Sequence, residues 1–498
     1  MRNKKVIIIG AGIAGLAAAM KLSTSGINVE VYEQHEKPGG KIRYFDSKVG
    51  PIDAGPTVLT MYNVFADLFH SCGFKIDEKL KFIKEETIAR HWWRDGSSLD
   101  LYSCFEKNLE EIKHFAGNKS ALEFEKFNKF SRDLFGLFKD PIIMNSKPDI
   151  FPVLVNGLKN IKLLKDILIK NKKLYGYLNE NFSDYRLKQL FSRYSTYVGG
   201  SPFNSPSILS LIWHVECQGV WRIAGGMYDL VKQIETISKR SNAGFFYKNK
   251  VKKILMKNNK INGIELKNKK VIDCDTIIFN GDPKALFDGL LGDEIQNAVS
   301  NNNINKRSLS AYVWSFAAKT KGLDLLHHNV LFNKNYKTEF DDIERGEIPK
   351  DPTLYICAQG SINNPKPKEK SLGRFEIIIN GSPTYNHKKY NKQKEYTKCK
   401  EITFSILESM GLKMDLKPTE EMLTTPKEFE QLFPGSQGSL YGRTPHGINS
   451  TFMRPRNKSK IKGLLLAGGG THPGAGIPMA CLSGKHAAEM ILKDLSLT

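Results

Sequence analysis

Three glycines and an acid near the N-terminus have the spacing of a dinucleotide-binding turn. Gly10, Gly12 and Gly15 follow the apolar run 6–9 in the order G-x-G-x-x-G, and Glu33 closes the next apolar run. In such a turn the first glycine permits a tight bend, the second lets the backbone approach a pyrophosphate, and the third lets helix and strand pack closely. An acid about 20 residues further on reaches a ribose hydroxyl and disfavours a 2′-phosphate. The sequence therefore predicts a bound dinucleotide that lacks this phosphate.

A second glycine-rich stretch, near the C-terminus, could face the same ligand. The apolar run 464–466 predicts a strand, which enters the loop AGGGTHPGAG and then a predicted helix over about 479–493. Free N–H groups at a helix start stabilise an oxygen that gains negative charge, as the pyrimidine edge of a flavin does on reduction. A plain glycine loop is the alternative. We find no second strand–GxGxxG–helix unit, which disfavours a nicotinamide-using reductase of the two-dinucleotide type.

The elements that must position these residues are discontinuous along the chain. Residues 1–75 alternate strand, helix and strand, whereas about 105–215 show long helical patterns. Strand patterns return at 251–255, 261–266 and 271–279. The sequence therefore predicts an α/β nucleotide-binding lobe built from distant segments, with the intervening segments forming a second lobe.

Composition narrows the class of protein. The 498-residue chain has 74 Lys and Arg against 52 Asp and Glu, a net charge of +22 that attracts the phosphates of nucleic acid or anionic lipid. No nucleic-acid motif accompanies this charge, and drift toward Lys in an AT-rich genome is an alternative explanation. The seven cysteines and eleven histidines show no C-x-x-C or H-x-x-x-H spacing, so we expect free thiols and no metal site.

Short motifs along nearly the whole chain resemble those of the carotenoid desaturase family of FAD-dependent oxidoreductases. They are GAGIAGLAAA at the first glycine turn, PGGKIRYF (38–45), DAGPTVLT (53–60), AGGMYDLVKQI (224–234), NGDP (280–283), TFMRP (451–455) and THPGAGIPMACLSG (471–484). The stretches HVECQGVWRIAGGM (214–227) and LYGRTPHG (440–447) are most similar to the 1-hydroxycarotenoid 3,4-desaturases, also called hydroxyneurosporene desaturases. The chain departs from the family pattern at Lys41, where Arg is commoner, and at Gly281, where Ala is commoner.

The resemblance implies a flavin amine oxidase-like architecture. A Rossmann-type, α/β FAD-binding lobe with a parallel sheet and helices would comprise residues 1–104, 215–305 and 440–498. An α+β lobe that binds the substrate and associates with the membrane would comprise residues 105–214 and 306–439.

The resemblance also implies an activity in carotenoid biosynthesis. The enzyme would introduce a C-3,4 double bond into an acyclic 1-hydroxycarotenoid by hydride transfer to FAD, with oxygen or a quinone as electron acceptor. A phytoene-type desaturase, a carotene isomerase and a flavin amine oxidase are alternatives of the same fold. A non-catalytic lipid- or carotenoid-binding protein is a further alternative, against which the intact motifs at both ends argue.

The same motifs predict the residues that contact FAD. Lys41 would meet its ribose or phosphates, Thr57 and Asp282 would lie near the flavin ring, and Val251 would pass the adenine; ordinary turn, helix-cap and core positions are the alternatives. The predicted contacts are Gly10, Gly12, Ile13, Ala14, Gly15, Glu33, Gly40, Lys41, Gly55, Pro56, Thr57, Val251, Asp282, Gly470, Thr471, Gly476, Ile477, Pro478 and Met479.

The catalytic residues are not identified by this pattern. Because the flavin accepts the hydride, the protein must orient the substrate and provide a route for one proton. His214 and Glu216, which precede the AGGM motif, are candidate proton acceptors, and a structural role is the alternative for both. The hydroxyl of the substrate would need one hydrogen-bond partner in an otherwise apolar tunnel, and the sequence names no residue for it.

A basic amphipathic pattern at 155–178 predicts contact with a membrane. Ile161, Leu164 and Leu168 share one helical face, and lysines occupy another, as in helices that lie on anionic bilayers. Packing of the apolar face on the core is the alternative. No segment has the pattern of a signal peptide or a transmembrane helix. We therefore expect a peripheral protein on the cytoplasmic side of the cell membrane, with no nucleic acid among its partners.

Overall fold

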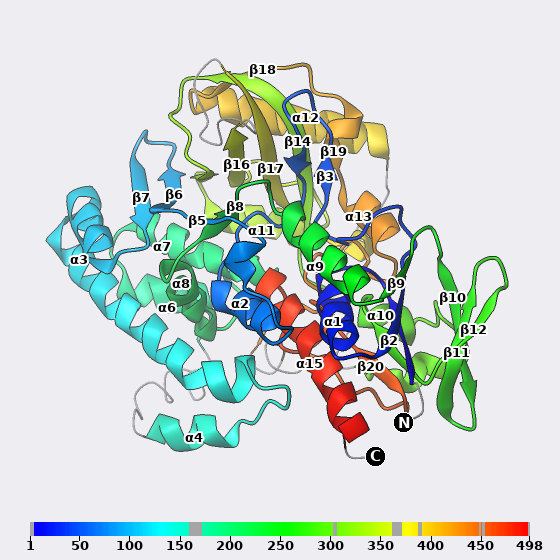
Figure 1. Ribbon diagram of the computed structural model, residues 1–498. Coiled ribbons are helices and arrows are strands. Elements are labelled where there is room, and N and C mark those ends of the chain that lie inside the picture. Colours follow the sequence, from blue (N-terminus) through cyan, green and yellow to red (C-terminus); the bar gives the residue numbers. More distant parts are fainter. Residues whose placement is uncertain are drawn as a thin grey trace.

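The computed structural model describes residues 4–158, 172–301, 306–360, 371–386, 391–447, 450 and 454–496. Two sheets and the helices packed on them form the body of this part of the chain (Figure 1). Residues 159–171, which carry much of the predicted basic helix, lie outside the described residues, as do residues 451–453 of the TFMRP motif.

The first glycine turn belongs to a five-stranded parallel sheet with the order β20-β13-β1-β2-β9. Ile7 and Ile8 of its central strand are fully buried, as a continuous apolar run predicts for a parallel sheet covered on both faces. The predicted α/β fold is confirmed, since strands far apart in sequence pair side by side. The strands are β1 (Lys5–Ile9), β2 (Asn28–Tyr32), β9 (Gly244–Phe246), β13 (Thr276–Phe279) and β20 (Leu464–Leu466).

Alternate residues of β1 enter two separate cores. Val6 and Ile8 pack with α1 (Ile13–Thr24), α2 (Tyr62–His70), α9 (Tyr228–Arg240) and α15 (Ile477–Ser496). Ile7 and Ile9 pack on the opposite face with α10 (Pro283–Phe287) and an antiparallel sheet of β10 (Val251–Lys257), β11 (Lys260–Leu266) and β12 (Val271–Asp273).

The two ends of the chain meet where α1 packs against α15. A Cβ added at Gly484 would lie 2.0 Å from the carbonyl oxygen of Ala14, so only glycine allows the helices this approach. Blue α1 and red α15 accordingly lie side by side in Figure 1.

One predicted strand, 271–279, is in fact two strands in different sheets. The chain leaves the antiparallel sheet after Asp273 and enters the parallel sheet at Thr276. No glycine or proline marks this junction in the sequence, and only the pairing partners separate the two strands.

The second large sheet is mixed and has eight strands, in the order β18-β14-β17-β16-β15-β6-β7 with β19 paired to β14. Its hairpin of β6 and β7 lies within residues 1–104, which the sequence assigned to the FAD-binding lobe; we propose to count this hairpin with the second lobe. The strands are β6 (Thr87–Trp92), β7 (Ser98–Tyr102), β14 (Ser310–Lys321), β15 (His328–Leu331), β16 (Leu354–Gly360), β17 (Leu372–Gly381), β18 (Lys413–Asp415) and β19 (Leu423–Thr424). Two small antiparallel pairs join β3 (Tyr44–Phe45) to β4 (Ile52–Asp53), and β5 (Phe82–Lys84) to β8 (Trp221–Ile223).

Helices surround this second sheet. The longest, α3 (Phe105–Phe138), continues into a π-helical turn, Lys139–Ile143, and a short connection leads on to α4. The others are α4 (Phe151–Leu158), α6 (Leu174–Asn181), α7 (Tyr185–Ser192), α8 (Leu211–Cys217), α11 (Tyr336–Glu344), α12 (Lys392–Ser409) and α13 (Pro426–Leu432). None of the described helices is long and apolar enough to cross a bilayer.

Candidate functional site

A cavity of about 770 Å³ lies between the carboxyl ends of the parallel strands and the second sheet. Glycines from both ends of the chain line it, together with residues of β14, β16 and β17. Ligands of open parallel sheets bind at this edge, where strand ends and helix starts point into one crevice.

The first glycine turn presents free backbone donors to the cavity. Gly10 adopts a φ of +101°, and Gly12 is the N-cap of α1 without a side chain that caps the helix. The N–H of Gly15 donates to the side chain of Asn280, but those of Ile13 and Ala14 have no partner among the described residues and are left for a ligand, where the helix dipole favours an anion. Gly40 closes over this turn, since a Cβ added to it would lie 3.0 Å from the Cα of Gly12.

Gly15, also predicted as a contact, allows the close packing of the turn. It does not line the cavity, and a Cβ at this position would lie 2.2 Å from the carbonyl oxygen of Gly10. The other predicted residues of this turn, Ile13 and Ala14, do line the cavity.

Glu33 stands at the carboxyl end of β2, with its carboxylate facing the same turn. One oxygen accepts a hydrogen bond from the backbone N–H of Ala11 at 2.7 Å, and the other accepts from that of His35 at 2.9 Å. These bonds hold the acid in place at the cavity wall, where a ribose hydroxyl would find an acceptor. Val251, predicted to pass the adenine, lines the same end of the cavity.

Lys41 extends across the cavity wall to the C-terminal part of the chain. Its ammonium donates to the backbone carbonyl of Leu440 and lies 5.5 Å from the centre of the Phe433 ring. Burial lowers the pKa of Lys41 to about 8, and the nearby charge of Arg454 acts in the same direction. An anion that binds beside such a buried cation stabilises its charged form.

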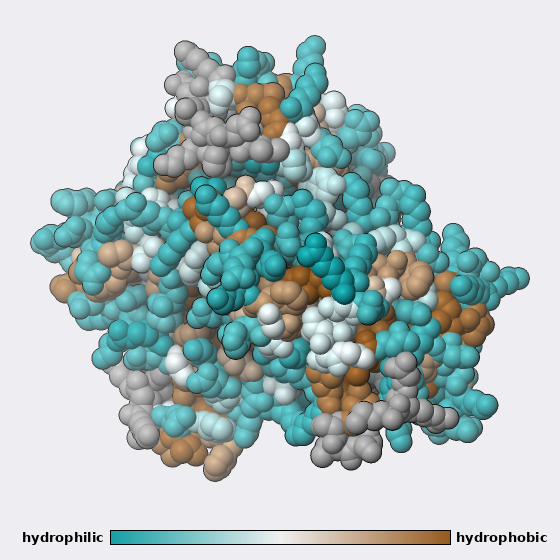
Figure 2. All heavy atoms as spheres, viewed as in Figure 1, coloured by the Kyte–Doolittle hydropathy of each residue, from teal (hydrophilic) through white to brown (hydrophobic). Residues whose placement is uncertain are grey.

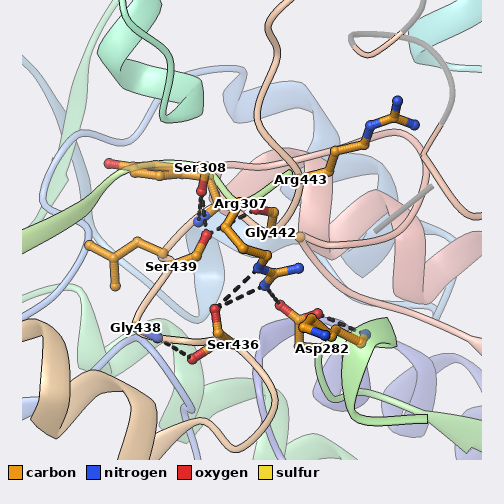
Figure 3. Close-up of polar contacts among 12 residues, drawn as sticks. Asp282, Arg307, Ser308, Ser436, Gly438, Ser439, Gly442 and Arg443 are labelled. Atoms are coloured by element: carbon orange, nitrogen blue, oxygen red, sulfur yellow. Dashed lines mark hydrogen bonds and ion pairs between the residues drawn. The ribbon is translucent and has the colours of Figure 1, made fainter. Parts of the chain in front are cut away.

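Asp282 has a structural partner that the sequence did not predict. It pairs with the buried guanidinium of Arg307, which also donates to the carbonyl of Ser436 at 3.1 Å (Figure 3). Asp282 caps α10 as well, because its side chain accepts from the N–H of Lys284 at 2.9 Å. Asp282 therefore caps α10, which was the alternative interpretation of this residue, and it also lies on the cavity wall.

The remaining predicted contacts fall on two loops. Gly55, Pro56 and Thr57 follow β4 and line the cavity. From the C-terminal loop and the start of α15, the cavity is lined by Gly470, Gly476, Ile477, Pro478 and Met479. Thr471 does not line it and is fully buried beneath the loop.

His214 and Glu216 of α8 do not line the cavity, although Val215 between them does. The carboxylate of Glu216 accepts hydrogen bonds from the hydroxyls of Tyr194 and Tyr197. Burial raises the pKa of Glu216 and lowers that of His214. A proton that moves from a substrate to either residue would have to pass through a neighbour such as Tyr197, which does line the cavity.

Beyond the glycine turns the cavity continues into an apolar arm. Phe135 and Phe138 of α3, Ile142 of the π-helical turn, and Ile208 and Ile212 near α8 line this arm. The cavity wall also includes polar residues that were not predicted from the sequence: Arg193, Tyr197, Tyr336, Thr353, Tyr355, Glu376, Asn380 and Tyr441. Of these, Glu376 could have been noticed as the single acid within the apolar run 375–379.

The sequence predicted no metal site, and the described residues contain one group of metal-ligating atoms, from His327, His328 and Cys357. Burial lowers the pKa of His327 to about 4, and the charges of Arg222 and Arg374 lower it further. This electropositive surrounding disfavours a cation, and both histidines already hydrogen-bond, to Ala358 and Tyr355.

The residues present fit FAD. The close approaches at Gly12 and Gly40, the uncapped start of α1 and the fixed acid at Glu33 form a cradle for an adenylate and a pyrophosphate. The start of α15 provides backbone donors at the other end of the same cavity.

Comparisons with known proteins agree with this site. A family model described as flavin containing amine oxidoreductase matches residues 13–492. Hydroxyneurosporene desaturase of Cereibacter sphaeroides is 43% identical over 492 residues, covering 99% of this chain and 98% of the relative. A 1-hydroxycarotenoid 3,4-desaturase of a Flavobacterium species is 30% identical, covering 98% and 99%. Cyclohexylamine oxidase from Brevibacterium oxydans shares the fold, with a TM-score of 0.57, 16% identity and coverage of 99% and 100%.

Proposed function

The chain belongs to the family of flavin-containing amine oxidoreductases, with FAD as its cofactor, and on that premise we propose that it introduces the C-3,4 double bond into an acyclic 1-hydroxycarotenoid. One observation carries the proposal: a single cavity of about 770 Å³ is lined both by the dinucleotide cradle and by a set of apolar side chains from α3, α8 and the π-helical turn. The arm suits a polyene, and the whole-length similarity to desaturases of hydroxycarotenoids supports the substrate class.

For this reaction the protein mainly has to bind and orient the substrate and to exclude water from the site. When bound, FAD supplies the acceptor for the two electrons that leave the substrate as a hydride. Phe135, Phe138 and Ile212 form apolar walls that align the chain and keep water from it. The second hydrogen leaves the neighbouring carbon as a proton. Tyr197 lines the cavity and hydrogen-bonds to Glu216 and Arg193, so it connects the cavity to one of the predicted proton acceptors.

A carotenoid barely dissolves in water, so we propose that the protein takes it directly from a membrane. The helix α4 exposes Phe151, Leu154, Val155 and Leu158, whose exposed fractions range from 40% to 67%. Figure 2 shows hydrophobic surface at the lower edge of the molecule, where Figure 1 places α4. The π-helical turn that leads into α4 contributes Ile142 and Ile143 to the apolar arm, so α4 and the arm are adjacent along the chain. The net charge of +22 favours an anionic surface, which we place on the cytoplasmic side of the cell membrane.

Expression in cells that accumulate either phytoene or an acyclic 1-hydroxycarotenoid tests the substrate. A red shift of pigment absorption in the second strain alone is expected. A shift in the phytoene strain alone would contradict the proposal and favour the phytoene-type alternative.

The electron acceptor forms part of the same proposal. The purified enzyme is expected to be yellow and to turn over with oxygen or with an added quinone. Turnover measured anaerobically with and without the quinone separates the two acceptors, and colourless protein that cannot be reconstituted with FAD would contradict the proposal as a whole.

A further inference from the structure

The wall of the apolar arm carries a buried carboxyl group without a partner. Glu376 of β17 is fully buried and lines the cavity, and neither of its side-chain oxygens makes a full hydrogen bond among the described residues, although the backbone N–H of Gly55 lies nearby. A buried polar group left unpaired costs stability, so its presence calls for an explanation.

The strand register places this group beside the predicted flavin site. Along β17, Glu376, Ile378 and Asn380 point to the same face, and all three line the cavity. Glu376 is paired across the sheet with Ser315 and Cys357, at the end of this face that adjoins Gly55. Gly55 begins the Gly55–Thr57 stretch that also lines the cavity. Because the sequence predicts the flavin ring beside this stretch, we expect the acid to lie close to the reacting carbons.

Burial also shifts the pKa of the Glu376 carboxyl group. It raises the pKa of Glu376 well above its usual range, and the charge of Asp53 acts in the same direction. The guanidinium of Arg43 and the N–H of Gly55 lower the pKa but do not outweigh burial. This shift favours the protonated carboxylic acid, which offers one O–H donor and one carbonyl acceptor.

We propose that Glu376 recognises the hydroxyl on carbon 1 of the substrate and thereby determines its specificity. This inference rests on the function proposed above. A tertiary alcohol is both a donor and an acceptor, so it can pair with both atoms of a neutral carboxyl group. Carbon 1 is separated from carbon 3 by a single carbon, so the partner of the hydroxyl must lie next to the reacting bond, which we place beside Gly55–Thr57 and therefore near Glu376.

Other polar groups on the wall fit this role less well. The hydroxyl of Tyr355 is already shared with Thr57 and His328, at 2.7 Å from each. Tyr336 and Thr353 have buried oxygens without partners, but they gather at the other end of the face, around Glu339 and Asn380. They serve as controls for a polar group elsewhere in the same cavity.

The test compares two substrates in two variants of Glu376. Glu376→Gln keeps a neutral donor and acceptor, whereas Glu376→Leu removes both and should fold, because an unpaired buried acid is replaced by an apolar side chain. For each protein, kcat/KM is measured with an acyclic 1-hydroxycarotenoid and with the same carotenoid without its hydroxyl. Retention of each carotenoid from loaded micelles, under anaerobic conditions and quantified after extraction, gives a readout that does not depend on turnover.

The preference for the hydroxylated substrate, in both kcat/KM and retention, is expected to fall about 10- to 100-fold in Glu376→Leu and to persist in Glu376→Gln. Tyr336→Phe, which removes an unpartnered hydroxyl at the far end, should keep the preference. An unchanged preference in Glu376→Leu, or its loss in Tyr336→Phe, would overturn the inference. Loss of turnover with both substrates in Glu376→Gln, at normal retention, would also overturn it, since that result assigns Glu376 a proton-transfer role.

Failure of the proposed function gives a different result. Wild-type protein that desaturates neither substrate would contradict the function itself, whereas active wild-type protein with unaltered discrimination in Glu376→Leu contradicts only the role of Glu376.

Discussion

The side chain of Asn280 joins the two glycine-rich turns of the chain through Gly15. Its Oδ1 accepts a hydrogen bond from the backbone N–H of Gly15 at 3.0 Å, and its Nδ2 donates to the carbonyl of Ala467 at 3.0 Å. Asn280 follows β13, which lies between β1 and β20 in the sheet. One amide thus connects the first turn of α1 to the strand end that leads into α15.

Asn280→Ala should weaken both the fold and the retention of FAD. It leaves one backbone donor and one backbone acceptor unpaired in a largely buried site, at a cost of about 1–3 kcal/mol each. Asn280→Asp, which keeps the acceptor for Gly15, should lose less. Thermal unfolding and the FAD-to-protein ratio measure the effect, with Asn179→Ala on the surface of α6 as the control. Equal melting temperatures for Asn280→Ala and wild type would contradict this role.

Gly12→Ala should abolish the retention of FAD because of space rather than backbone strain. The φ of Gly12 is −72°, which alanine adopts readily, but the added Cβ would lie 2.8 Å from Oδ1 of Asn280 and would project where a pyrophosphate approaches. In the double variant Gly12→Ala/Asn280→Ala the first clash is gone. The double variant should retain less FAD than Asn280→Ala alone; equal retention in these two proteins would show that only the contact with Asn280 had mattered.

A matched glycine provides the control for this substitution. Gly176 is exposed within α6, and an added Cβ there would meet no atom within 4 Å. Gly176→Ala should retain FAD and gain roughly 0.5–1 kcal/mol of stability, because alanine loses less conformational freedom in a helix.

FAD binding should weaken as the pH rises above 8. The pKa of Lys41 is lowered to about 8 by burial, so in the free protein the side chain loses its proton near that pH. Bound phosphate favours the charged form, hence binding takes up a proton above pH 8 and the affinity falls as the pH increases toward the usual pKa of lysine. Fluorescence titration with FAD between pH 7 and about 10 measures this slope.

The matched variant is Lys41→Arg, whose guanidinium keeps its proton throughout this range. Its affinity for FAD should stay flat where that of the wild type falls. The same slope in both proteins would exclude Lys41 as the group that senses the phosphates.

The double variant Leu154→Ser/Leu158→Ser should release the protein from membranes. Both leucines are exposed on α4, and burying a leucine side chain in lipid contributes about 1.5–3 kcal/mol. The fraction that floats with anionic liposomes should fall tenfold or more, and salt should release the wild type. Leu122→Ser, which changes an equally exposed leucine on α3, is the control. Wild-type protein that binds neutral liposomes as well as anionic ones would remove the electrostatic part of the proposal.

Local patterns in the sequence were sufficient for much of this protein. The turn of Gly10, Gly12 and Gly15 and the acid at Glu33 depend on residues close together in the chain, because a strand, a tight bend and a helix start have local steric requirements. The strands at 251–255 and 261–266 were predicted for the same reason. The C-terminal helix was predicted as well, and it begins at Ile477, two residues before the predicted start at about Met479.

Only the tertiary structure decided which distant residues meet. The sequence around Asp282 does not predict its ion pair with Arg307, and the sequence around Gly15 does not predict its hydrogen bond to Asn280. The division of 271–279 between two sheets likewise depends on strands elsewhere in the chain. Glu376 is the clearest case. The sequence shows an acid within the apolar run 375–379. Whether this acid faces solvent, an ion-pair partner or a substrate depends on strand register and burial, which are set by long-range packing.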